Sequence, residues 1–280
     1  MENIPEQKQE KQPGDEHKMV PQPEFIRDSY KGSEKLKHKV AMITGGDSGI
    51  GRSVAVHFAR EGADCCIVYK NEDLDALETK NLVEKEGRKC LLIRGDLTSE
   101  KYCTDVVESC ISEFKRLDIL VNNAAVQFPK ECIQEISEDQ LKETFEVNIF
   151  AMFSLIKAAL KYMESGGRII NSTSVTAYRG SSHLVDYAAT KGAITSLTRS
   201  LAKQLAEKGI LVNGVAPGPI WTPLIPATFD EVSEFGRKTP LGRPGQPSEV
   251  GPAYVFLACN DASYVTGQVI HVNGGEVIGA

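Results

Sequence analysis

Two side chains suited to proton transfer lie four residues apart in the sequence. Tyr187 and Lys191 have the i, i+4 spacing that places both side chains on one face of a helix. A free tyrosine has a pKa of about 10, too high for a base at neutral pH, and a nearby ammonium group lowers that pKa by favouring the phenolate. Tyr187 could then exchange a proton with an alcohol or a carbonyl oxygen, and Ser174 could hydrogen-bond that same oxygen.

The second chemical signal is a glycine-rich segment at residues 44–51, with the sequence TGGDSGIG. Glycines allow the backbone to approach a pyrophosphate closely, and a helix N-terminus presents free N–H groups and a positive dipole to it. Glycine clusters also mark ordinary turns. Here the segment follows an apolar run and precedes a helical pattern, and this context favours a nucleotide site.

The spacing G-x-x-x-G-x-G resembles the cofactor loop of the short-chain dehydrogenases/reductases. Further motifs match that family in order and spacing: residues 122–125 (NNAA, with Ala125 where the family has glycine), Asn148, Ser174, residues 187–191 (YAATK), and Pro217 with Gly218. The resemblance covers about residues 38–280. It implies a catalytic set of Asn148, Ser174, Tyr187 and Lys191, in which Asn148 anchors a water that links Lys191 to solvent.

The resemblance also implies which residues contact a nicotinamide dinucleotide. Lys191 would bind the nicotinamide ribose, and Asp96 the adenine edge. Ile220 and Thr222 would bind the carboxamide. The full set implied is Gly45, Asp47, Ser48, Gly49, Ile50, Gly51, Tyr69, Lys70, Asp96, Leu97, Asn123, Ala124, Tyr187, Lys191, Pro217, Gly218, Ile220 and Thr222.

The choice between NADP and NAD depends on the end of the second predicted strand. Tyr69 stands where many NAD-dependent members have an aspartate, and Lys70 could attract a 2′-phosphate. Against this, Ser48 stands where many NADP-dependent members have arginine, and residues 72–73 are acids that could serve an NAD ribose. We expect NADP(H) to be preferred, with NAD(H) as an alternative.

Hydrophobic periodicity predicts the elements that position these residues. Short apolar runs predict strands at 39–44, 64–69, 89–94, 118–121, 168–171, 210–215 and 268–272. Helical patterns separate them, including a long helix at about 138–163 and others near 184–208 and 247–258. Alternating strands and helices indicate an α/β fold: a single doubly wound Rossmann-type domain, with a seven-stranded parallel sheet and helices on both faces.

The first 37 residues differ from the rest of the chain. They are rich in proline and in charges of both signs and cannot bury enough apolar surface to fold alone. We therefore expect a polar N-terminal arm at 1–37, partly disordered, before a dinucleotide-binding and catalytic domain at 38–280. Residues from about Pro21 to Leu36 should pack on the domain or on a neighbouring subunit, and residues before about Asp15 should be mobile.

The composition excludes several classes of protein. The apolar and charged fractions, 41% and 25%, exclude a fully disordered or collagen-like chain. The sequence predicts no transmembrane helix, and a net charge of −6 argues against nucleic acid or an anionic membrane as the main partner. Seven scattered cysteines without a C-x-x-C pair predict reduced thiols in a cytoplasmic protein with a metal-free active site.

Together these features predict an NAD(P)-dependent oxidoreductase that transfers hydride between nicotinamide and a small alcohol or carbonyl substrate. The chain resembles the bacterial general-stress oxidoreductases of the YhdF and YghA type, which suggests an aldehyde, sugar or polyol. The alternatives are a 3-oxoacyl carrier-protein reductase and a non-catalytic dinucleotide sensor. Family resemblance and the surplus of apolar residues at 138–163 and 184–208 predict a homotetramer.

Overall fold

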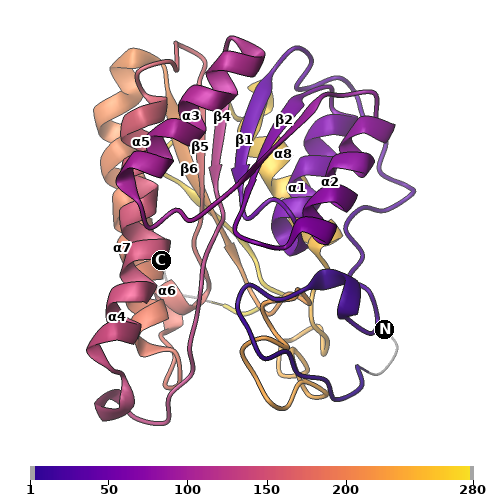
Figure 1. Ribbon diagram of the computed structural model, residues 1–280, viewed down its shortest axis with the longest axis vertical. Helices are drawn as coiled ribbons and strands as arrows, with labels where there is room; N and C mark the ends of the chain where they lie inside the picture. Colours follow the sequence, from indigo (N-terminus) through magenta and orange to yellow (C-terminus); the bar gives the residue numbers. More distant parts are fainter. Residues whose placement is uncertain (1–3, 278–280) are drawn as a thin grey trace.

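The structure, a computed structural model, describes residues 4–277, and within them a sheet of seven parallel strands forms the centre (Figure 1). The strands lie in the order β3-β2-β1-β4-β5-β6-β7. Their bounds are β1 Val40–Thr44, β2 Asp64–Tyr69, β3 Cys90–Arg94, β4 Ile119–Asn122, β5 Arg168–Ser172, β6 Leu211–Pro217 and β7 Val269–Val272. The predicted fold class is confirmed, and each strand begins and ends within two residues of its predicted bounds.

Helices cover both faces of the sheet, as Figure 1 shows. Helices α1, α2 and α8 pack on one face, and α3, α5 and α7 on the other. Alternate strand residues therefore enter two different cores: Ala41 and Ile43 of β1 enter the first, and Val40 and Met42 the second. The bounds are α1 Gly49–Arg60, α2 Asp73–Lys85, α3 Glu100–Phe114, α4 Glu138–Phe145, α5 Ala151–Ala159, α6 Thr176–Arg179, α7 Val185–Leu205 and α8 Pro247–Ala258.

Short helical turns complete the described secondary structure. They are η1 Glu16–Lys18, η2 Ile133–Glu135, η4 Ala206–Lys208 and η5 Asn260–Ala262, together with the π-helical η3 Glu146–Phe150. The long helix predicted at about 138–163 is present as a continuous helical segment from Glu138 to Ala159, which ends four residues early and contains the π-helical turn η3. This turn contains Asn148, whose side chain bonds the backbone of Val126 in another segment.

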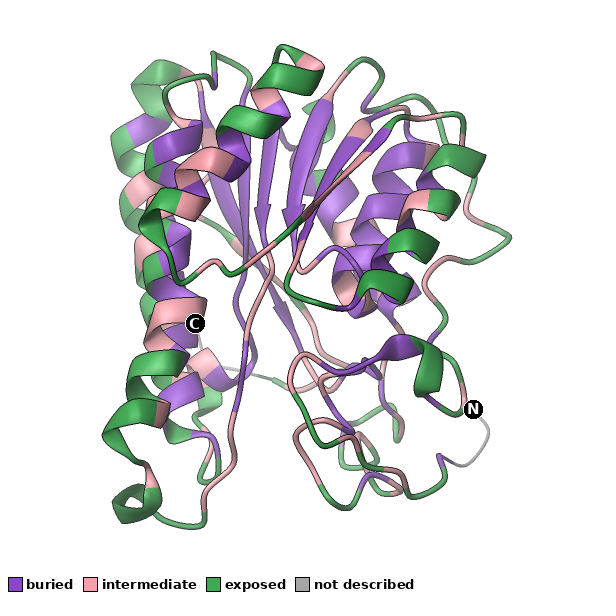
Figure 2. Ribbon diagram, viewed as in Figure 1, coloured by how far each residue is buried: buried purple, intermediate pink, exposed green. Residues whose placement is uncertain are grey.

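A lid segment, residues 218–246, follows β6 and lies against the first part of the N-terminal arm (Figures 1 and 2). Ile4 and Met19 of the arm pack with Trp221 and Ile225 of the lid in a small core of their own. The indole nitrogen of Trp221 donates to the carbonyl oxygen of Pro21 at 2.9 Å. The arm and the lid therefore form one packed layer beside the carboxyl ends of the strands. The mobility predicted for residues before about Asp15 stays a prediction.

The second part of the arm is fixed to the end of α1. The carboxylate of Glu61 accepts hydrogen bonds from the hydroxyl of Tyr30 at 2.6 Å and from the backbone nitrogens of Ser33 and Lys35 at 2.9 and 3.1 Å. Leu36 is buried in the core beneath α1 and α8. Residues 30–36 thus join the arm to the same layer that carries the glycine-rich loop.

Candidate active site

A cavity of about 440 Å³ opens at the carboxyl ends of the strands. Parallel α/β sheets place ligand sites at this edge, where the strand order reverses. Every site residue predicted from the sequence lines this cavity except Gly51 and Asn148. The structure therefore brings together segments that lie up to 177 residues apart in the chain, from Gly45 to Thr222.

The glycine-rich loop forms one wall of the cavity and leads into the N-terminus of α1. Gly45 and Gly49 have φ values of +59° and +52°, which favour glycine over other residues. A Cβ atom on Gly51 would lie 1.9 Å from the carbonyl oxygen of Gly45. Gly51 thus allows the helix to pack closely on its own loop, behind the wall, instead of lining the cavity itself.

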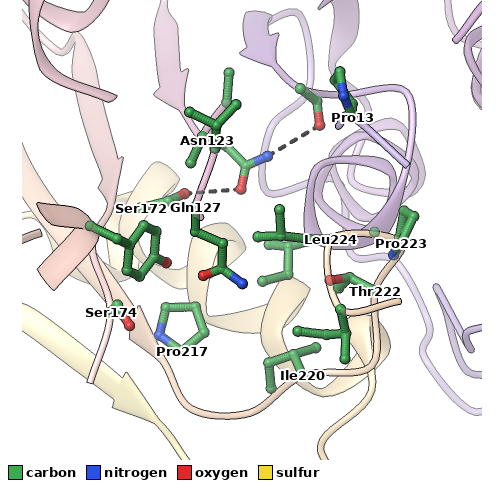
Figure 3. A pocket seen from close by; sticks show the side chains of 18 of the residues that line it. Pro13, Asn123, Gln127, Ser172, Ser174, Pro217, Ile220, Thr222, Pro223 and Leu224 are labelled. Atoms are coloured by element: carbon green, nitrogen blue, oxygen red, sulfur yellow. Dashed lines mark hydrogen bonds between the residues drawn. The ribbon is translucent and has the colours of Figure 1, made fainter. Parts of the chain in front are cut away.

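The amide of Asn123 joins the glycine-rich loop to β5. Its nitrogen donates to the carbonyl oxygen of Gly45 at 3.1 Å, and its oxygen accepts from the hydroxyl of Ser172 at 3.1 Å, the bond drawn between the two labelled residues in Figure 3. Ser172 also hydrogen-bonds the hydroxyl of Tyr254 at 2.6 Å. The sequence predicted a cofactor contact at Asn123, but it gave no sign of the roles of Ser172 and Tyr254.

Helix α7 and the end of β5 bring three polar side chains together in the cavity. Tyr187 and Lys191 lie one turn apart on α7, with the Lys191 nitrogen 5.3 Å from the centroid of the Tyr187 ring. That nitrogen donates to the carbonyl oxygen of Ser172 at 2.8 Å. The hydroxyl of Ser174, two residues further along, lies near the phenol of Tyr187 and acts to lower its pKa. The arrangement aims a phenol and a hydroxyl at one position.

Burial controls the charge state of this group. Desolvation raises the pKa of Tyr187 to about 12, although the Ser174 hydroxyl opposes the shift. Desolvation lowers the pKa of Lys191 to about 7. Burial of the phenol outweighs the expected lowering of the Tyr187 pKa by an ammonium group, and burial also disfavours the charge on Lys191. Near neutral pH, Tyr187 is a protonated phenol.

Asn148 lies behind the cavity wall, and its side chain is fully occupied. Its oxygen accepts from the backbone nitrogen of Val126 at 2.9 Å, and its nitrogen donates to the carbonyl oxygen of Val126 at 3.0 Å and to the hydroxyl of Thr190 at 3.2 Å. The side chain thus links η3 to the segment after β4 and to α7. The role of Asn148 as a water anchor stays a prediction. Because its side chain already bonds Val126 and Thr190, the backbone of Asn148 would hold the water.

At the other end of the cavity, Tyr69 ends β2 and Lys70 follows it. The Lys70 nitrogen lies 3.4 Å from a carboxylate oxygen of Asp96, and all three residues line the cavity. The acids that could serve an NAD ribose do not line it. Glu72 is buried, and Asp73 accepts a hydrogen bond from the hydroxyl of Tyr69 at 2.9 Å.

The arm reaches the glycine-rich loop through a buried ion-pair network. Glu16 pairs with Arg52 at 2.5 Å and accepts from the backbone nitrogen of Gly49 at 2.5 Å. Arg52 also donates to the carbonyl oxygens of Asp47 and Asp75, each at 2.9 Å. The network connects η1, the glycine-rich loop and α2, and nothing in the sequence pattern indicated it.

One group of potential metal ligands lies beside this network, outside the cavity lining. Carboxylate oxygens of Asp15 and Asp75 and a ring nitrogen of His17 lie within 4.8 Å of one another. Asp15 pairs with Lys18 at 2.6 Å, and Asp75 lies 3.6 Å from Arg52, so cations of the protein already offset both carboxylates. The metal-free active site stays a prediction.

The sheet order and the cavity at its carboxyl edge define a Rossmann-type α/β protein. A family model described as enoyl-(acyl carrier protein) reductase matches residues 45–276. The chain belongs to the short-chain dehydrogenase/reductase family of oxidoreductases. No helix among residues 4–277 is long and apolar enough to cross a membrane.

Three curated relatives are similar over almost their whole length. The uncharacterized oxidoreductase YhdF of Bacillus subtilis is 57% identical, over 97% of this chain and 95% of its own. NADPH-dependent aldehyde reductase 1, chloroplastic, of Arabidopsis thaliana is 52% identical, over 98% of both chains. Glucose and ribitol dehydrogenase of Daucus carota is 50% identical, over 98% of this chain and 97% of its own. The predicted resemblance to the YhdF-type oxidoreductases is confirmed.

Two solved structures with bound cofactor have the same fold. A short-chain dehydrogenase from Burkholderia cenocepacia in complex with NADP has a TM-score of 0.81 and 29% identity, over 86% of this chain and 98% of its own. A blue fluorescent protein from a metagenomic library in complex with NADPH has a TM-score of 0.81 and 34% identity, over the same shares.

Proposed function

We propose that the protein is an NADP(H)-preferring oxidoreductase that interconverts a small alcohol and its aldehyde or ketone, with Tyr187 as the acid and base. The observation that carries this proposal is the cavity itself. It joins the glycine-rich loop and Lys70 at one end to Ser174, Tyr187 and Lys191 at the other. A dinucleotide would span the cavity, with its pyrophosphate at the N-terminus of α1.

In the direction of reduction, the nicotinamide supplies a hydride to the carbonyl carbon of the substrate. Tyr187 donates its phenolic proton to the carbonyl oxygen, so the product is the alcohol. Ser174 holds that oxygen by a hydrogen bond as negative charge develops on it. The raised pKa of Tyr187 keeps the proton available at neutral pH. Lys191 lies within reach of the ring and can stabilise the phenolate that remains.

The cofactor preference rests on which side chains line the cavity. Lys70 lines it, whereas Glu72 and Asp73 do not. The cation of Lys70 suits a 2′-phosphate, and the carboxylates of Glu72 and Asp73 are not placed there to pair with the ribose hydroxyls of NAD. Asp96 lines the cavity beside Lys70, 3.4 Å from its nitrogen, and is expected at the adenine edge. The similarity to a plant NADPH-dependent aldehyde reductase and to a structure in complex with NADPH supports the same preference.

Two alternatives from the sequence find less support. An acidic carrier protein would need an excess of positive charge at the cavity, but the lining side chains of Arg179 and His183 lie 3.4 and 3.7 Å from acids, Glu276 and Glu131. A non-catalytic sensor would not need Ser174, Tyr187 and Lys191 together in the cavity lining. A homotetramer and a cytoplasmic location complete the proposal. The free state of all seven cysteines, six of them buried, supports the location.

The test is a spectrophotometric screen of aldehydes, ketones, sugars and polyols with each nicotinamide cofactor. On the best substrate, Tyr187→Phe should lower kcat by about 100-fold or more, on the scale of general acid catalysis, because it removes one phenolic proton. NADPH binding, measured by its fluorescence, should persist. The exposed Tyr264→Phe is the matched control. Near wild-type turnover by Tyr187→Phe would exclude this tyrosine as the acid.

A further inference from the structure

Gln127 presents an unused hydrogen-bond acceptor to the cavity. It follows the NNAA motif, is buried, and lines the cavity together with Ser174. In Figure 3 its amide points into the cavity between Ser174 and Leu224, with the oxygen on the Ser174 side. The neighbouring lining residues Val126, Val147 and Leu184 are apolar. The described residues offer this oxygen no donor.

The hydrogen bonds of Thr228 fix which way the Gln127 amide faces. The hydroxyl of Thr228 has one proton and donates it to the carbonyl oxygen of Leu224 at 2.6 Å. Toward Gln127, at 3.1 Å, the Thr228 oxygen must therefore accept. The amide nitrogen of Gln127 lies on that side, and its oxygen is left for the cavity.

The N-terminal arm holds the backbone of Gln127 in place. The side-chain oxygen of Gln12 accepts from the backbone nitrogen of Gln127 at 3.1 Å, and the side-chain nitrogen of Gln12 donates to the carbonyl oxygen of Gln127 at 2.5 Å. Both ends of one amide thus bond the same residue, 115 positions further along the chain. This pairing fixes the point from which the Gln127 side chain extends.

We propose that Gln127 selects substrates that carry a second hydroxyl group besides the reacting oxygen, and that Gln12 is its positioning residue. This inference rests on the proposed function. The second hydroxyl donates to the free oxygen of Gln127 while the reacting oxygen lies at Ser174 and Tyr187. A substrate without that hydroxyl covers the acceptor and leaves it unpaired, which penalises its binding. The substrate class is therefore hydroxylated aldehydes and ketones and the corresponding polyols.

The test compares each hydroxylated substrate from the screen with its analogue that lacks the second hydroxyl, such as glycolaldehyde with acetaldehyde. Gln127→Met keeps the length of the side chain and removes the acceptor. It should lower kcat/KM about tenfold for the hydroxylated substrate, the value of one hydrogen bond, and leave the analogue within about twofold. Dividing the wild-type value by the variant value for each substrate cancels differences in aldehyde hydration. Unchanged thermal unfolding and NADPH affinity show that the variant folds and binds cofactor.

Gln12→Leu should raise KM for the hydroxylated substrate with little change in kcat, because it loosens Gln127 without touching Tyr187. Gln22→Leu is the matched control, since Gln22 bonds only residues of the arm. Equal losses on both substrates, or weaker NADPH binding by Gln127→Met, would overturn the inference, as would a screen whose best substrates carry no second hydroxyl. Failure of the proposed function differs from all of these, because the wild type then shows no turnover of any substrate.

Discussion

Lys191 is buried in a position where desolvation disfavours its charged form. The side chain is buried, and its pKa falls to about 7 from an ordinary value near 10.5. Below pH 7 the folded and unfolded states are both charged, so the folded state bears the full cost of burying the ammonium. Between about pH 7 and 10.5 only the unfolded state keeps the proton, and stability rises with pH by up to about 1.4 kcal/mol per unit.

The rise of stability with pH gives a prediction for the protein without cofactor. Lys191→Met removes the buried charge, so the variant should exceed the wild type in free energy of unfolding most at pH 6 and least at pH 9. Urea denaturation at the two pH values measures the difference. The exposed Lys203→Met, on the same helix, should show no such trend. A constant difference for Lys191→Met would contradict a lowered pKa in the folded state.

Lys70 is the residue on which cofactor preference should depend. Tyr69→Asp with Lys70→Ala replaces the lining cation with a carboxylate that would pair with ribose hydroxyls and repel a 2′-phosphate. The NADP/NAD ratio of kcat/KM should fall by about tenfold or more, on the scale of one lost charged hydrogen bond. Lys80→Ala, on α2 and outside the cavity lining, is the control. An unchanged ratio would show that Lys70 does not determine the cofactor preference.

At the scale of elements, the sequence pattern predicted those strands and helices that depend on local sequence. The apolar runs of β1 to β7 matched the structure closely, because a strand covered on both faces must be apolar throughout. The π-helical turn η3 could not be predicted, since residues 145–152 contain no proline or glycine. It carries the contact between Asn148 and Val126, which exists only after folding. The pairing of Gln12 with Gln127 could not be predicted from the sequence for the same reason.

The contact of η1 with α1 gives a prediction at this scale. Glu16→Gln removes the nearer of the two carboxylates that Arg52 contacts, and breaking a buried ion pair typically costs about 3–5 kcal/mol. The arm should open more often, and trypsin should cleave it at least about tenfold faster at Lys11 or Lys18. Gel analysis of a cleavage time course measures the rate. Glu10→Gln, at an exposed position of the arm, is the control. Equal cleavage rates would show that the pair does not hold the arm.

At the scale of the whole molecule, the predicted tetramer has a candidate surface. Phe150 and Phe153 are exposed at and beside α5, whereas Ile149 and Ile156 of the same region are buried. Light scattering coupled to size exclusion should give four times the chain mass of 30.6 kDa. Phe150→Glu with Phe153→Glu should lower that mass, because two charges would be buried in the contact. Leu74→Glu, equally exposed but on α2, should not. A wild-type monomer at micromolar concentration would exclude the tetramer.

The fluorescence of Trp221 reports on the contact between the N-terminal arm and the lid. It is the chain's single tryptophan, it is fully buried, and its indole N–H bonds the arm at Pro21. All tryptophan fluorescence therefore comes from the junction of arm and lid. Release of the arm would expose the indole to water and shift its emission to longer wavelength. Reduced nicotinamide absorbs where indole emits, so a cofactor bound in the adjoining cavity would quench the same signal by energy transfer. Cofactor binding and arm movement can thus be followed in the unlabelled protein as two separable spectral changes.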